Sequence, residues 1–144
     1  MSILSVDKVK LNVNVKDKFE AIRIAGELLV QAGHAEASYV DSMIDRENTL
    51  STYMGGGLAI PHGTNEAKGK IKSTGLSIVQ IPSGVDFGDG EKAYLVIGIA
   101  AVGDDHMEIL TNVAMVCSDD ENLERIVKAG TPQQLIEIFE SEME

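Results

Sequence analysis

One histidine occurs in a setting that suits nucleophilic chemistry. His62 lies between Pro61 and Gly63, directly after the short apolar run Leu58–Ile60. Proline restricts the residue before it to extended backbone and glycine permits a sharp turn, so we expect the imidazole to be held at the end of a strand. A neutral imidazole offers a lone pair near neutral pH, because its usual pKa is about 6.5. The pattern favours His62 as a nucleophile, and a turn histidine without a chemical role fits the local sequence equally well.

Two further side chains could bind the oxygens of an anion. His106 lies at the expected start of a helix, where unpaired backbone N–H groups attract phosphate. The neighbouring Asp104 and Asp105 would repel an anion if they faced it, so His106 taken alone is better explained as a surface residue. Arg46 carries a planar guanidinium that can bind phosphate through two parallel hydrogen bonds, although an arginine on the polar side of a helix is usually solvated.

Other kinds of site fit the sequence poorly. The chain has no H-E-x-x-H segment, no paired cysteine ligands and no P-loop. His62, His106 and Asp104 could in principle form a metal site, but their spacing is not diagnostic, so this alternative ranks low. Cys117 lies on an apolar helical stripe and is expected in the core. His34 follows a helix-ending glycine and is expected at the surface.

Composition limits the remaining classes of function. The chain has 144 residues, one cysteine, 44% hydrophobic residues and a formal net charge of −11 at pH 7. Such a charge disfavours binding to nucleic acid or anionic lipid, and it serves either solubility or docking to a basic partner. No apolar run approaches the ~18 residues of a membrane helix, and no signal peptide is evident at the N-terminus. We therefore expect one soluble, cytoplasmic domain over residues 1–144.

The elements that must position these side chains begin with two helices. Asp17 followed by Glu20 forms a capping pattern, an apolar stripe of helical period follows it, and Gly33 supplies a stop. A second helix is expected from about Ser38. It would bury Val40, Met43, Ile44 and Leu50, and leave Asp41, Asp45, Arg46 and Glu47 nearer to water.

Strands are expected in the middle of the chain and helices at its end. The short run Leu58–Ile60 is predicted as a strand, as are Thr74–Ile81 and Tyr94–Ala101, and the last of these is apolar enough for a central strand covered on both faces. Pro82–Gly90 is expected to be a loop, with Val85 and Phe87 in a short strand at most. Further helices are predicted from Asp105, from Asp119 or Asp120, and from Thr131. This order favours an α/β domain with a sheet covered on both sides.

Several segments carry a resemblance to a known family. Ser51–Gly63 resembles the phosphorylation-site signature of mannitol/fructose-type enzyme IIA proteins of the bacterial phosphotransferase system. Gly84–Gly88, Leu95–Ala101 and Asp105–Leu110 are similar to the mannitol branch. The resemblance covers nearly the whole chain and implies a mixed sheet flanked by helices on both faces. Gly56 departs from it, because many relatives would have asparagine there.

The resemblance also implies roles for residues and partners. His62 would accept a phosphoryl group on Nε2 from the phosphocarrier HPr and pass it to a cysteine of the EIIB domain of the mannitol transporter. His106 and Arg46 fall on the family's second histidine and its arginine, and would stabilise the phosphoryl oxygens. No metal or cofactor is implied, and contact with the membrane would be indirect, through the transporter. A nitrogen-type regulatory homologue and a non-catalytic binding module stay open as alternatives.

Overall fold

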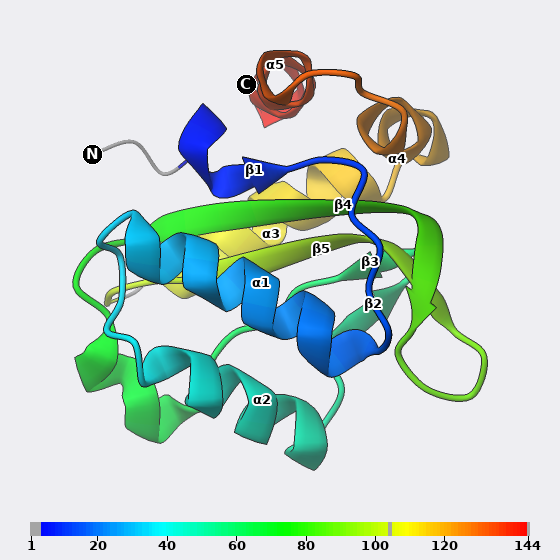
Figure 1. Cartoon of the computed structure of the whole chain (residues 1–144). Helices are drawn as coiled ribbons and strands as arrows, with labels where there is room; N and C mark the ends of the chain where they lie inside the picture. The colour runs from blue at the N-terminus through cyan, green and yellow to red at the C-terminus, as the bar shows by residue number, and fades with distance from the viewer. Residues whose placement is uncertain (1–3, 104, 144) are drawn as a thin grey trace.

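A mixed five-stranded sheet forms the middle layer of the protein (Figure 1). The computed structural model describes residues 4–103 and 105–143. The strand order is β1-β4-β5-β3-β2, in which β4 pairs antiparallel with β5, and β1 and β3 add in parallel on either side of that pair. The strands are β1 (Val9–Lys10), β2 (Tyr53–Gly55), β3 (Leu58–Ala59), β4 (Gly75–Asp86) and β5 (Lys92–Ala100).

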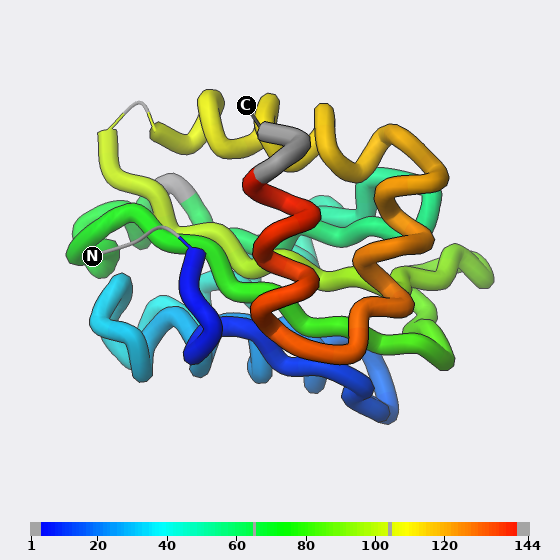
Figure 2. Tube along the Cα trace, turned by 90° about the horizontal axis from the view of Figure 1, so that it is seen from above, coloured from blue at the N-terminus to red at the C-terminus, as the bar shows by residue number. Residues whose placement is uncertain are grey.

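Helices cover both faces of this sheet. One layer holds α1 and α2, and the other holds α3, α4 and α5, with α4 and α5 side by side when seen from above (Figure 1, Figure 2). The fold class expected from the sequence, an α/β domain with a mixed sheet flanked by helices on both faces, is therefore confirmed. The helices are α1 (Lys18–Gln31), α2 (Tyr39–Thr49), α3 (Asp105–Cys117), α4 (Asp120–Val127) and α5 (Pro132–Met143), with 3₁₀ helices η1 (Val6–Lys8) and η2 (Asn65–Lys70).

The two apolar cores meet at the central strand β5. Leu95, Ile97 and Ile99 belong to the core under α3, α4 and α5, whereas Val96 and Ala100 belong to the core under α1 and α2. Each large side chain removed from water in this way contributes about 1.5–3 kcal/mol. The expected central strand, covered on both faces, is thus confirmed.

The predicted helix caps are present. Oδ1 of Asp17 accepts the N–H of Glu20 at 2.9 Å, and Gly33 follows α1 with a φ of 84°. At the other end of the chain, the Thr131 hydroxyl accepts the N–H of Gln134 at 3.1 Å, and α5 begins at Pro132. These caps satisfy terminal backbone groups that would otherwise lack partners, which explains why local sequence located the helix ends.

The prediction that Pro82–Gly90 forms a loop is wrong for the first half of this segment. The strand β4 continues to Asp86, and Val85 pairs with Ala93 after a register shift that follows Gln80. Pro82 is tolerated because it lies within this irregularity, where the ladder does not require its missing N–H. The long hairpin that results extends the sheet beyond the span predicted from β-branched residues.

The α2 helix corrects two further expectations. Leu50 is 65% exposed rather than buried, and Glu47, expected near water, is only 3% exposed. The Glu47 carboxylate is satisfied inside the protein: Oε1 accepts the N–H of Thr52 at 2.8 Å and its hydroxyl at 2.7 Å, while Oε2 pairs with Nζ of Lys18 at 3.1 Å. Because these partners lie on other segments, the helical pattern of α2 could not reveal the burial.

His34, expected at the surface, is fully buried. Its Nε2 lies 2.7 Å from Nζ of the buried Lys8, and its Nδ1 lies 2.9 Å from the Ser73 hydroxyl. Space for the ring exists because a Cβ at Gly75 would stand only 2.4 Å from it. Burial, and next the charge of Lys8, lower the pKa of His34, so the ring is neutral and can accept a hydrogen bond from the ammonium.

This cluster predicts a dependence of stability on pH. The pKa of His34 is lower in the folded state than its ordinary 6.5, so the unfolded chain binds the proton more readily. The contribution of His34 is complete above about pH 6.5 and is lost as the pH falls below that value. We expect the free energy of unfolding, measured with urea, to fall less between pH 7.5 and 5.5 in His34→Gln than in the wild type.

At pH 7.5 the same substitution should cost about 1–3 kcal/mol, because Lys8 would have a poorer buried acceptor. Carboxylates titrate alike in both proteins and cancel in the comparison. Parallel curves for the two proteins would contradict the assignment.

Candidate active site

The His62 turn is fixed to the central strand of the sheet. His62 forms a parallel bridge with Ile99, whose N–H donates to the carbonyl of Pro61 at 3.0 Å. On the other side, the buried Tyr39 hydroxyl donates to the carbonyl of Ile99 and accepts the N–H of Gly63, both at 2.9 Å. Because backbone contacts hold the residues before and after it, His62 has a defined position at the carboxyl end of β3.

The His62 ring has a defined tautomer as well. Its Nδ1 lies 2.9 Å from the carbonyl oxygen of Ile60, which can only accept, so Nδ1 carries the proton and Nε2 carries the lone pair. Burial lowers the pKa of His62; the hydrogen bond to Ile60 opposes this, and electrostatic interactions with His106 and Arg46 lower it further. His62 is therefore neutral at neutral pH, as attack by Nε2 requires.

The fold brings His106 beside His62. The two ring centroids are 4.9 Å apart, with the rings edge to face at 66°. Burial lowers the pKa of His106, and the charges of Lys68 and Arg46 act in the same direction. The Asp105 carboxylate accepts a hydrogen bond from the Thr74 hydroxyl and lines a separate cavity. Asp104 lies outside the described residues.

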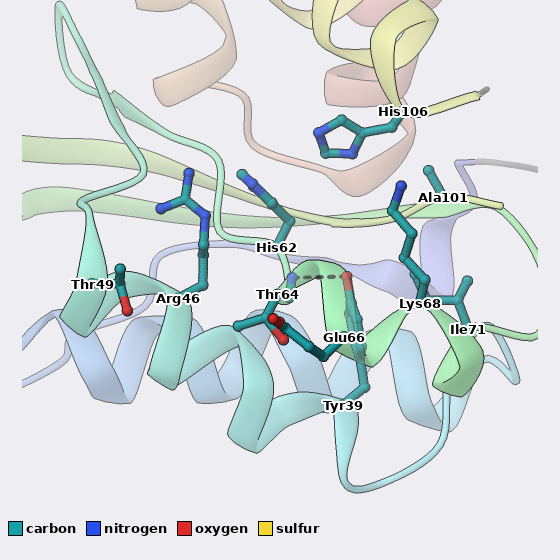
Figure 3. A pocket seen from close by; sticks show the side chains of 11 residues that line it. Tyr39, Arg46, Thr49, His62, Thr64, Glu66, Lys68, Ile71, Ala101 and His106 are labelled. Carbon is teal, nitrogen blue, oxygen red and sulfur yellow. Dashed lines mark hydrogen bonds between the residues drawn. The ribbon is translucent and has the colours of Figure 1, made fainter. Parts of the chain in front are cut away.

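Arg46 completes the group of three. It lies in the last turn of α2 and is half-buried, and its Nη1 donates to the carbonyl of Leu50 at 2.5 Å. Arg46, His62 and His106 line one cavity of about 410 Å³ (Figure 3). The three residues singled out in the sequence are thus neighbours in space, although they come from α2, the turn after β3, and α3.

A second, less polar cavity lies next to the first. It measures about 300 Å³, and the same three residues, Arg46, His62 and His106, also line it. Met54, 54% exposed, belongs to this cavity, so an apolar side chain stands beside the histidine pair. The remaining lining residues are Ser51, Thr52, Ile60 and Leu110.

Three residues of this site were missed from the sequence. Tyr39, which holds the Gly63 N–H, and Glu47, which anchors Thr52, act through contacts between distant segments. Lys68 lines the larger cavity from η2. Of the three, only Lys68 could have been suspected from the sequence. It lies six positions after His62, so its side chain can reach the histidine if the chain between them turns.

The chemistry available here is that of a neutral nucleophile surrounded by cations. Within residues 4–103 and 105–143, no group of three or more His, Cys, Asp or Glu side chains could hold a metal ion. Cys117 is buried as expected, and burial raises the pKa of its thiol to about 12, so it is no nucleophile at neutral pH. No described helix combines the length and apolar character needed to cross a membrane.

Comparison with known proteins gives consistent results for sequence and structure. The family model described as "Phosphoenolpyruvate-dependent sugar phosphotransferase system, EIIA 2" matches residues 2–142. A mannitol-specific phosphotransferase enzyme IIA component from Geobacillus stearothermophilus is 50% identical over 139 residues, which is 96% of each chain.

Two solved structures from Escherichia coli have the same fold. The crystal structure of IIA mannitol superposes with a TM-score of 0.89 at 38% identity, covering 94% of this chain and 98% of that one. IIA mannitol in complex with phosphorylated IIB mannitol gives a TM-score of 0.88 at 36% identity, covering 96% and 97%. The likeness to both structures therefore covers nearly the whole chain.

The Tyr39 contacts predict a positioning effect on His62. Tyr39→Phe removes the hydroxyl that pairs the N–H of Gly63 with the carbonyl of Ile99, and should lower the free energy of unfolding by about 1–3 kcal/mol. Because a looser turn admits water to the ring, the pKa of His62 should rise toward 6.5 in an NMR titration. Tyr94→Phe, a matched change on β5, should leave that pKa in place. Equal pKa values in all three proteins would refute this role.

Proposed function

The chain belongs to the EIIA 2 family of the phosphoenolpyruvate-dependent sugar phosphotransferase system, and from this premise we propose that it carries phosphoryl groups for a mannitol transporter. His62 accepts the group from phospho-HPr and transfers it to a cysteine of the cognate EIIB domain. The observation that carries the proposal is the neutral His62 ring, with its Nδ1 proton held by Ile60 and its Nε2 lone pair available beside Arg46 and His106.

Each transfer balances without movement of a proton. The lone pair on Nε2 of His62 attacks the phosphorus of the HPr phosphohistidine in line, and the breaking P–N bond returns its electron pair to the HPr ring. Nδ1 of His62 keeps its proton throughout, against the carbonyl of Ile60. In the second transfer, the EIIB thiolate attacks the phosphorus and the electron pair returns to Nε2. Phosphohistidine is therefore the intermediate.

Arg46 and His106 stabilise negative charge in the transition state and form no covalent bond. The transition state of phosphoryl transfer is loose and spreads negative charge over three oxygens, so positioning and electrostatic stabilisation supply most of the catalysis. The Arg46 guanidinium can bind two of these oxygens in parallel. The lowered pKa of His106 leaves its ring neutral, so it can donate one N–H hydrogen bond to a phosphoryl oxygen. No metal or cofactor enters this scheme.

The relatives support the proposed acceptor and the proposed sugar. The Escherichia coli IIA mannitol that shares this fold has been solved in complex with phosphorylated IIB mannitol, which supports an EIIB domain as the acceptor. Mannitol as the sugar is supported by the name of the 50% identical relative. In this scheme the protein is one domain over residues 1–144, works in the cytoplasm with HPr, and meets the membrane only through the transporter.

The relay is tested by intact mass. After incubation with phosphoenolpyruvate, enzyme I and HPr, the wild type should gain one phosphoryl group and His62→Ala none. His34→Gln, which removes a buried histidine outside the site, should still gain it. A wild type that gains nothing would overturn the proposal and favour a non-catalytic binding module.

The stabilising roles predict rates. Arg46→Gln should accept the phosphoryl group about 10²-fold more slowly, because one donor to the developing charge is lost. Rapid-quench mass spectrometry measures this rate, with Arg23→Gln, a change of the same charge on α1, as the control. An Arg46→Gln rate equal to that of the control would refute the assignment.

The acceptor is tested by mixing phosphorylated protein with EIIB domains. Transfer to the EIIB domain of a mannitol transporter is expected. Failure of that transfer, with phosphorylation by HPr intact, would favour the nitrogen-type regulatory alternative.

A further inference from the structure

Lys68 is placed to act on the same cavity as Arg46. It belongs to η2, the 3₁₀ helix after the His62 turn, and its exposed side chain lines the 410 Å³ cavity. Figure 3 shows its ammonium pointing toward His106, with Arg46 on the other side of His62. The backbone beneath it is anchored, because the N–H of Ile71 donates to the carbonyl of Lys68 at 3.2 Å. The cavity thus has a cation on each side of the nucleophile.

The charges around the cavity favour an anion. Among the described residues, neither Lys68 nor Arg46 takes part in an ion pair, so no carboxylate within 4 Å neutralises either charge. Among the charged side chains in the described part of the chain, Lys68 lowers the pKa of His106 the most, and Arg46 comes next. The Lys68 ammonium is therefore within electrostatic range of that ring. Glu66 supplies the carboxylate of the lining. With both histidines neutral, the lining is net positive in a chain whose formal charge is −11.

We propose that Lys68 is the second cation of the phosphoryl site, and that Lys68 and Arg46 together enclose a tetrahedral dianion at Nε2 of His62. This inference rests on the proposed function and extends it to a residue on η2. The Arg46 fork matches two oxygens of the group, and the Lys68 ammonium, a point charge on a flexible stem, contacts the third.

The dianion site is tested first without phosphoryl transfer. Sulfate, which keeps its two charges near neutral pH, is titrated into the wild type, Lys68→Gln and Lys70→Gln while the ring signals of His62 and His106 are followed by NMR. Lys70 is the matched control, because it lies on the same η2 helix but outside the cavity lining. At low salt, Lys68→Gln should raise the Kd for sulfate roughly fivefold, the size expected for one exposed charge contact, and Lys70→Gln should not.

Two readouts separate a direct contact from a structural effect. The pKa of His106 should rise in Lys68→Gln and stay in place in Lys70→Gln, because a positive charge near the ring is removed only in the first. Lys68→Arg should restore sulfate binding, and the difference between wild type and Lys68→Gln should shrink in high salt as the charge is screened.

Phosphoryl transfer forms the second arm. At saturating phospho-HPr, His62 should be phosphorylated roughly fivefold more slowly in Lys68→Gln than in Lys70→Gln, for the same electrostatic reason. Sulfate binding identical in Lys68→Gln and Lys70→Gln would overturn the inference and leave the carrier role untouched. So would a loss confined to the KM for HPr, which would assign Lys68 to docking. Conversely, a wild type that binds sulfate through Lys68 but gains no phosphoryl group would overturn the proposed function alone.

Discussion

The hydrogen bond between Nδ1 of His62 and the carbonyl of Ile60 is the interaction on which the site depends. It fixes both the orientation of the ring and the nitrogen that carries the proton. The bond holds only because Ile60 is itself held, since its N–H donates to the carbonyl of Thr52 at 3.0 Å. Thr52 in turn donates its N–H and hydroxyl to the buried carboxylate of Glu47. A short series of hydrogen bonds thus runs from the buried side of α2 to the His62 ring.

Glu47 makes this series rigid because a buried carboxylate cannot be left without partners. Burial alone would raise its pKa, but hydrogen bonds from Ser51, Thr52 and Lys18 outweigh that effect and hold the pKa below its ordinary value. Lys18 also donates to the carbonyl of Phe87 in the hairpin loop. The network therefore joins α1, α2, the hairpin and the segment before His62, so the packing of the whole α1/α2 layer positions the site.

The surroundings of the ring divide into two environments with different uses. Arg46 and Lys68 line a polar cavity beside the ring. Met54 and Leu110 line a second, less polar cavity that opens beside the same histidine pair. Partial burial keeps His62 and His106 neutral between them. In the proposed function, the polar cavity would take the charged phosphoryl group.

The sequence by itself determined the helices, the longer strands and the His62 turn, because caps, apolar period and proline–glycine geometry act within a few residues. The tertiary structure alone decided which polar side chains are buried. Lys8 reaches His34 across 26 positions and Tyr39 reaches Ile99 across 60, so neither burial is visible in local pattern. The role of Glu47 was hidden for the same reason. The strands β1 and β2 were missed because two or three residues are too few to show a period. A polar residue is buried only where a distant segment supplies its partner, and the fold makes that choice.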